Sequence, residues 1–156
     1  MKTQATLDLE RRARWYVQKA RKGDTDCINS RVKYELECAD YENKTLTLRF
    51  KTEDWMMNPG GVLHGGMMST VLDITMGITS LTLSEFYCST VNMSVSFLAA
   101  APNNDELLVT ARATRVGRTF VQLVAEAVSQ QTGEICATST GLFYLSKNKL
   151  VVPEEN

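Results

Sequence analysis

The sequence predicts an α+β domain in which one antiparallel sheet wraps around a mostly apolar helix. Two observations lead to this fold class. Segments in which apolar and polar residues alternate, the pattern of half-buried strands, recur along most of the chain. Between them, the stretch from Met67 to Leu81 is apolar nearly all round, which is typical of a helix buried on most sides. The predicted order is one helix, two strands, the apolar helix and four more strands.

Length and composition favour a single folded domain. The chain has 156 residues, of which 44% are hydrophobic and 22% charged, as in an ordinary globular protein. We predict one domain over residues 1–156, with 1–27 as an N-terminal helical extension, 28–146 as the core and 147–156 as a tail. The net charge of -1 gives no general attraction to nucleic acid or to an anionic membrane, so we expect neither as a partner.

The cysteines and the N-terminus indicate a compartment. The four cysteines lie far apart without a CxxC pair, and the chain has one histidine, so we expect no metal and no bound cofactor. The first residues carry charges where a signal peptide would be apolar. The longest weakly charged run, Pro59 to Ser84, contains Asp73 and several glycines and is a poor membrane span. We expect a cytoplasmic protein with free thiols.

The first predicted element is an amphipathic helix over Leu7 to Lys22, because Leu9, Ala13 and Val17 follow helical spacing. Its basic residues are explained most simply as a solvated face, and attraction of a phosphorylated ligand is the alternative. In residues 30–38 and 44–50, apolar and polar residues alternate, which predicts a hairpin with one face exposed to solvent.

Four further strands are predicted after the apolar helix. Short turn sequences separate the last three, which therefore form a meander. The predicted strands are Phe86–Ala99, Glu106–Val116, Thr119–Gln130 and Glu134–Leu145.

The sequence "NPGGVLHGG", Asn58 to Gly66, places turn residues and the only histidine directly before the apolar helix. A helix start leaves several backbone N–H groups without partners inside the helix. Because Gly65 has no Cβ, a ligand atom can approach these groups closely. Such a site binds an anion, or polarises a carbonyl whose oxygen gains negative charge during a reaction. Glycine pairs also serve where only a tight loop is needed, so both interpretations stand at this point.

Asp73 lies inside the apolar helix with no cation within one helical turn. A carboxylate in such surroundings is costly and suits a general base or a nucleophile, although a structural acid bonded to hydroxyls is the alternative. At ~100° per residue, His64 and Asp73 would point to opposite sides, roughly 13 Å apart along the axis. They could then serve one substrate only if a two-fold axis brings together two copies of the chain. The count weakens if His64 precedes the regular helix.

These residues, in this order and spacing, resemble the hotdog-fold thioesterases, and more closely their phenylacetate-pathway (PaaI-like) branch and its human acyl-CoA thioesterase relatives. The resemblance covers Arg31 to Leu145 and includes "STVNMSVSFLAAA", "VGRT" and "TGEICATSTGLFYL". It implies a hotdog fold, here with an additional N-terminal helix. It also implies homodimers with composite sites, often paired into homotetramers, and hydrolysis of acyl-CoA thioesters, with coenzyme A as part of the substrate.

The resemblance also implies roles for five catalytic residues. Asp73 would act as base or nucleophile, and the Gly65 N–H would polarise the thioester carbonyl. Asn58 and His64 would orient substrate or water. Thr90, where the family more often has serine, would help to hold the attacking water.

A second group of residues is implied in substrate binding. Gly66 belongs to the helix start, and a turn places two cations where the family binds the coenzyme A part. An ordinary charged hairpin turn explains these cations equally well. The turn residues are Arg115, Gly117 and Arg118.

Two other functions fit the same fold. A non-catalytic acyl-CoA binding or sensing protein would keep the helix start but would have no use for an unpaired acid, so Asp73 favours the enzyme. A hotdog dehydratase would need its histidine and acid in another arrangement, near a proline-rich strand entry that this sequence lacks. The sequence does not indicate the acyl group.

Overall fold

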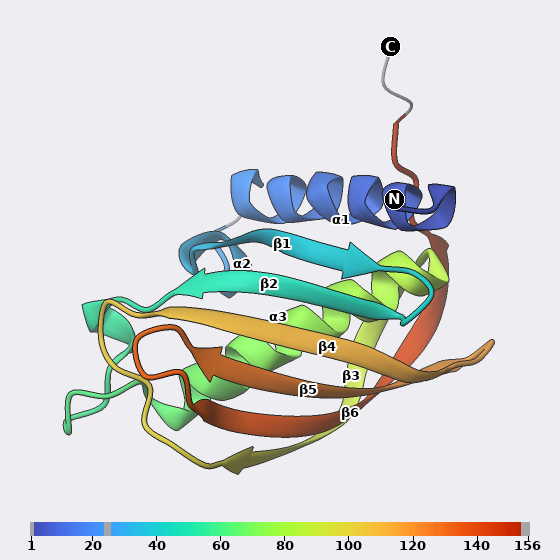
Figure 1. Ribbon diagram of the computed structural model, residues 1–156. Helices are drawn as coiled ribbons and strands as arrows, with labels where there is room; N and C mark the ends of the chain where they lie inside the picture. The colour runs from blue at the N-terminus through green and yellow to red at the C-terminus, as the bar shows by residue number, and fades with distance from the viewer. Residues whose placement is uncertain (1, 24–25, 154–156) are drawn as a thin grey trace.

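The computed structural model describes residues 2–23 and 26–153, and it has the predicted order of elements (Figure 1). Six strands form one antiparallel sheet in the order β1-β2-β4-β5-β6-β3. The helices are α1 Gln4–Lys22, α2 Ile28–Arg31, η1 Asp54–Met56 and α3 Gly65–Ser84. The strands are β1 Tyr34–Asp40, β2 Thr45–Lys51, β3 Phe86–Phe97, β4 Glu106–Val116, β5 Phe120–Ser129 and β6 Ile135–Lys149.

The sheet wraps around α3, as the apolar sequence of this helix predicts. Figure 1 shows α3 running along one side of the sheet, and it packs on β2 to β6. Small residues of the strands face the helix and let it lie close, notably Ala111, Ala125 and Gly141, all buried. A Cβ on Gly141 would lie 2.9 Å from the Met76 sulfur. By length and composition α3 could also cross a membrane, but here it is the core helix of the fold.

The amphipathic helix α1 lies along β1, at one side of the sheet (Figure 1). It buries Leu9, Ala13 and Val17, as its spacing predicts, and it begins three residues earlier than expected. The Arg12 guanidinium donates a hydrogen bond to the carbonyl oxygen of Thr82, 3.0 Å away, near the end of α3. One basic residue of α1 therefore holds the core helix instead of facing solvent.

Strand β3 forms an open edge of the sheet, because it pairs only with β6. The pairing shifts register between Thr90 and Asn92, where the strand is irregular. Along this edge, Val91, Phe97 and Leu98 are 54%, 58% and 61% exposed. A long edge that carries apolar side chains is normally covered in a soluble protein.

Two further boundaries differ from the predictions, and two short helices were not expected. Helix α3 continues to Ser84 and ends at Glu85, whose φ of 62° is left-handed and whose N–H bonds to the Leu81 carbonyl. The last strand runs to Lys149, so residues 147–149, expected in the tail, belong to the sheet. The short helices α2 and η1 were not predicted, because each spans less than two helical turns and leaves no periodic pattern.

Candidate active site

The predicted acid and the predicted hydroxyl meet between α3 and β3. The Thr90 hydroxyl donates a hydrogen bond of 2.7 Å to Oδ1 of Asp73. The contact forms because the left-handed Glu85 reverses the chain after α3, so that β3 returns alongside the helix. Asp73 is half-buried, and in the described part of the chain it forms no ion pair.

The start of α3 offers free backbone N–H groups. His64 is the N-cap, and its Nδ1 accepts a hydrogen bond of 2.9 Å from the Gly66 N–H. A neutral imidazole that accepts at Nδ1 carries its proton on Nε2. The His64 carbonyl accepts from the Met68 N–H at 3.0 Å. The Gly65 N–H has no acceptor within the described residues and remains available to a ligand.

Asn58 shapes the loop that leads into α3. Its Oδ1 accepts from the Gly60 N–H at 2.8 Å and from the Val62 N–H at 3.4 Å. The loop is tied down by His64, whose N–H donates to the Met56 carbonyl at 2.9 Å. In this structure the Asn58 side chain holds the loop, and its role in orienting substrate or water stays a prediction.

A pocket of about 380 Å³ opens beside the helix start. Both Gly65 and Asn58 line it. The other lining residues are Leu63, Met68, Phe97, Leu98, Ala99, Ala100, Ala101 and Cys136. Of the predicted catalytic residues, His64, Asp73 and Thr90 do not line it.

The two halves of the site lie apart within one chain. Gly65 and Asp73 are eight positions apart, which places them ~12 Å apart along the axis at ~1.5 Å per residue. The angular count from His64 was wrong, because His64 has extended backbone angles and precedes the helix. The axial separation does not depend on that count. One chain therefore does not bring both groups to one carbonyl.

The predicted phosphate-binding turn lies nearer to Thr90 than to Gly65. Phe143 of β6 pairs with Val121 on one side and with Thr90 on the other. The turn before β5 is therefore two strands from Thr90, roughly 10 Å at ~4.8 Å per strand. Arg115 and Arg118 are exposed and form no ion pair among the described residues.

Cys88 is a neighbour of the carboxylate that the sequence did not single out. Its thiol donates to the Gly77 carbonyl, with 3.4 Å between sulfur and oxygen. Burial raises the pKa of Cys88, and the Asp73 carboxylate raises it further, so the thiol stays neutral. Cys88 lies two residues before Thr90, and strand alternation could have placed both on the side facing α3.

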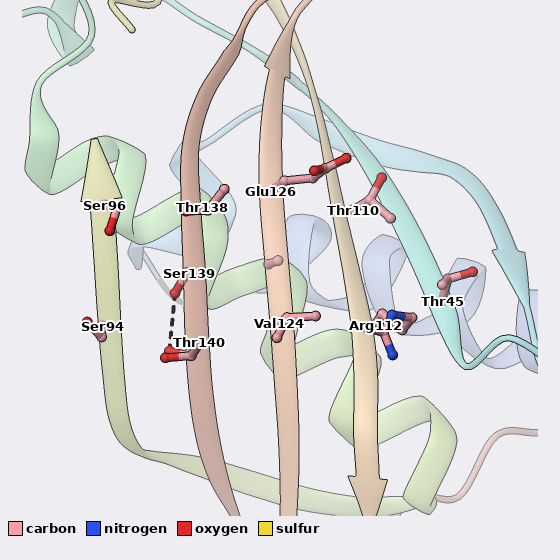
Figure 2. Close-up of a pocket in the computed structure, with 11 residues that line it drawn as sticks. Thr45, Ser94, Ser96, Thr110, Arg112, Val124, Glu126, Thr138, Ser139 and Thr140 are labelled. Carbon is pink, nitrogen blue, oxygen red and sulfur yellow. Dashed lines mark hydrogen bonds between the residues drawn. The ribbon is translucent and has the colours of Figure 1, made fainter. Parts of the chain in front are cut away.

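Two other features bear on what the chain can bind. A pocket of about 510 Å³ lies on the outer face of the sheet, away from α3 (Figure 2). Hydroxyl side chains dominate its wall, with Arg112 and Glu126 between them. In residues 2–23 and 26–153, no three His, Cys, Asp or Glu side chains come together as metal ligands.

A long antiparallel sheet around a central helix defines a hotdog-fold protein. The sequence model of the thioesterase superfamily matches residues 60–136, which include the start of α3, Asp73 and Thr90. The match covers just under half of the chain, which is similar to this superfamily there, and the chain is a thioester hydrolase.

Individual relatives agree with this assignment. The mouse acyl-coenzyme A thioesterase 13 is 24% identical over 99 residues, which cover 59% of this chain and 66% of the relative. The PaaI protein of the Escherichia coli phenylacetic acid degradation operon shares the fold, with a TM-score of 0.76 and 18% identity over 90% and 98% of the two chains. A hypothetical thioesterase protein of Streptococcus pneumoniae, crystallised with coenzyme A, also shares the fold, with a TM-score of 0.68 and 21% identity over 75% and 88% of the two chains.

Proposed function

We propose that this protein hydrolyses acyl-CoA thioesters and that Asp73 is its base or nucleophile. The observation that carries the proposal is the half-buried Asp73 carboxylate, which has no cation beside it in the described structure and is held by the Thr90 hydroxyl at 2.7 Å. The name of the mouse relative and the coenzyme A in the S. pneumoniae structure support an acyl-CoA substrate.

The chemistry follows from the two half-sites. The Gly65 N–H, at the positive end of α3, donates to the thioester oxygen and stabilises the oxyanion. With Asp73 as base, the carboxylate takes a proton from water while the water oxygen bonds to the acyl carbon. The carbon–sulfur bond then breaks, and the proton passes to the coenzyme A thiolate. With Asp73 as nucleophile, a mixed anhydride forms, the thiolate leaves, and water cleaves the anhydride.

The site is completed by a second copy of the chain. Because Gly65 and Asp73 of one chain lie ~12 Å apart, the acid that serves a given Gly65 belongs to a partner. The open edge of β3, with its exposed Val91, Phe97 and Leu98, is the surface on which two copies would meet. We therefore propose a homodimer with two composite sites. Pairing of dimers into homotetramers would add contacts between dimers without changing the two composite sites.

The decisive experiment compares Asp73→Asn with the wild type on a panel of acyl-CoAs. We expect kcat to fall by about 10² or more, the usual contribution of a general base, with KM changed little. Asp8→Asn, on α1 and away from the site, is the matched control and should keep full activity. Equal and negligible rates in the wild type and in Asp73→Asn, with acyl-CoA still bound, would establish the non-catalytic binding protein instead.

A further inference from the structure

We propose that a groove between α1 and the segment after β6 binds an amphiphilic anion, which is one charged head group carried on an apolar chain. The groove has a volume of about 370 Å³ and lies on the solvent-facing side of α1. We refer to it as the α1 groove. The inference does not depend on the proposed function, and it uses none of the residues of the candidate active site.

One wall of the α1 groove is a single face of the helix. Leu7, Arg11 and Arg14 follow each other at four and three positions, the spacing that places side chains side by side on a helix. The other wall is the segment after β6, which runs past α1 in Figure 1 and contributes Val152 and Pro153. The Arg11 guanidinium donates a hydrogen bond to the Pro153 carbonyl oxygen, 3.4 Å away, and so joins the two walls.

The α1 groove carries two guanidinium groups that no acid neutralises. Arg14 is exposed and forms no ion pair among the described residues, and there Arg11 has only its bond to the Pro153 carbonyl. Glu10 also lines the groove, but it is 8% exposed and its carboxylate is paired with the Lys2 ammonium at 2.5 Å. Several planar N–H donors therefore remain available for a carboxylate or a phosphate.

The remainder of the α1 groove offers apolar surface. Leu7 is 46% exposed, and Trp15 and Val152 are half-buried. Covering this surface with the apolar part of a ligand is favourable, because the surface is then removed from water. At ~30 Å³ for each non-hydrogen atom, 370 Å³ holds about a dozen such atoms, several times more than a bare carboxylate or phosphate has. The ligand that fits the groove therefore has a chain as well as a head.

The shape favours a ligand that is dissolved in water over a lipid bilayer. A helix that lies in a membrane surface turns its apolar face to the lipid, whereas α1 buries its apolar face on the domain. The apolar surface of the groove lies between two walls, where a flat bilayer does not reach it. The net charge of -1 also gives the whole chain no general attraction to anionic lipids. The free acid that hydrolysis of an acyl-CoA releases has the required chemistry whenever its acyl chain is apolar.

Trp15 makes binding at this groove measurable. The chain has two tryptophans, so Trp55→Phe leaves Trp15 as the one remaining reporter, and its emission reports the α1 groove instead of the candidate active site. The probe is decanoate, which has a carboxylate on an apolar chain. Acetate lacks the chain, and decyltrimethylammonium carries a chain of the same length with the opposite charge. All three are titrated below the concentrations at which they form micelles.

We expect decanoate to bind and to shift the Trp15 emission to shorter wavelength, because the ligand excludes water from the indole. Acetate and decyltrimethylammonium should bind at least about tenfold more weakly. Arg14→Gln should weaken decanoate binding about tenfold, through the loss of a charge-assisted hydrogen bond. Lys22→Gln removes the same charge from an exposed position of α1 outside the groove, so this matched control should change nothing.

A second variant tests the apolar part of the groove. Leu7→Asn changes a side chain that is 46% exposed, so it leaves the core of the fold intact. It should weaken decanoate binding about tenfold and leave acetate binding as it is. Three results would overturn the inference: a Trp15 emission that decanoate does not change, equal affinity for decanoate and decyltrimethylammonium, or equal losses in Arg14→Gln and Lys22→Gln.

Two other occupants of the groove are outcomes of the same experiment. If vesicles of phosphatidylcholine and phosphatidylserine sediment the wild type but not Arg14→Gln, the groove is a membrane contact and the inference is wrong. The sequence continues with Glu154 and Glu155, which lie outside the described residues. If decanoate binds to Glu154→Gln/Glu155→Gln but not to the wild type, the acids of the chain itself occupy the groove, and the inference is also wrong.

Discussion

Two inactive variants should restore each other's activity when they share a dimer. Asp73→Asn removes the carboxylate, and Gly65→Pro removes the N–H at the start of α3. In a mixed dimer, one site combines the intact Gly65 of the first chain with the intact Asp73 of the second. The other site carries both changes. This recovery requires that each site draw its two half-sites from different chains.

Gly65→Pro is a clean way to delete one N–H. Gly65 is the first residue of α3, where proline is well tolerated because that N–H has no partner inside the helix. The preceding His64 has φ -61° and ψ 136°, the extended geometry that a residue before proline prefers. Gly65→Ala keeps the N–H and adds a Cβ 3.4 Å from the Phe97 ring, so it isolates the steric effect.

The magnitude follows from the geometry and the statistics of mixing. Loss of one oxyanion donor lowers kcat by about 10² to 10³, and loss of the base lowers it by about 10² or more. Random pairing makes about half of the dimers mixed, and each has one intact site of two, so about one quarter of wild-type activity returns. The chains are co-expressed with different affinity tags, and kcat is measured on the acyl-CoA that the wild type hydrolyses fastest.

The control places both substitutions in one chain and pairs that chain with the wild type. Wild type co-expressed with the double variant Gly65→Pro/Asp73→Asn should retain about one quarter of the activity, because both sites of a mixed dimer are damaged. Sites contained within one chain would instead leave about one half. Activity of the first mixture no greater than the residual rates of its parents would refute the composite site.

Three further predictions concern binding and stability. Reversing the charge of Arg115 and Arg118 should raise KM for acyl-CoA about tenfold, because these cations would then repel the phosphates of coenzyme A. KM for the acyl-N-acetylcysteamine thioester, which has no phosphates, should stay the same. An unchanged KM for acyl-CoA would exclude phosphate binding by these two residues. Gly141→Ala should cost about 1 kcal/mol or more in urea unfolding, because its Cβ would lie 2.9 Å from the Met76 sulfur; an equal or higher midpoint contradicts this. Burial raises the pKa of Tyr34 to about 12 from 10.0. Its neutral form is thus favoured in the fold, so unfolding should become easier by about 2 kcal/mol as pH rises from 10 to 12, and Tyr34→Phe should lose that part of the pH dependence.

The order and type of the main elements could be predicted from the sequence because each has a strong period. The all-round apolar character of α3 predicts a buried helix, and the alternation in β4 and β5 predicts strands with one face on it. The boundaries were less accurate where capping decides them. Glu85 ends α3 with its backbone in the left-handed region. Glutamate rarely adopts this region, so its residue type does not predict the helix end.

The candidate residues of the site could be singled out from the sequence, but their arrangement could not. The family resemblance pointed to Asp73 and Thr90 together, and the bond between them is present. The angular count failed at His64, because histidine is not among the residues that usually cap a helix start, and the cap could not be recognised. The pocket beside Gly65 is built from segments far apart in the chain, so no local pattern reveals it.

The open edge of β3 has a consequence for the kinetics of the protein in solution. If two copies must meet along this edge before either acid reaches a substrate, the number of working sites obeys mass action. Specific activity then falls with dilution once the concentration drops below the dissociation constant of the dimer, even though every chain remains folded. A bound acyl-CoA that touches both copies stabilises the dimer and opposes this loss. Raising the substrate concentration therefore restores activity that dilution of the protein has removed.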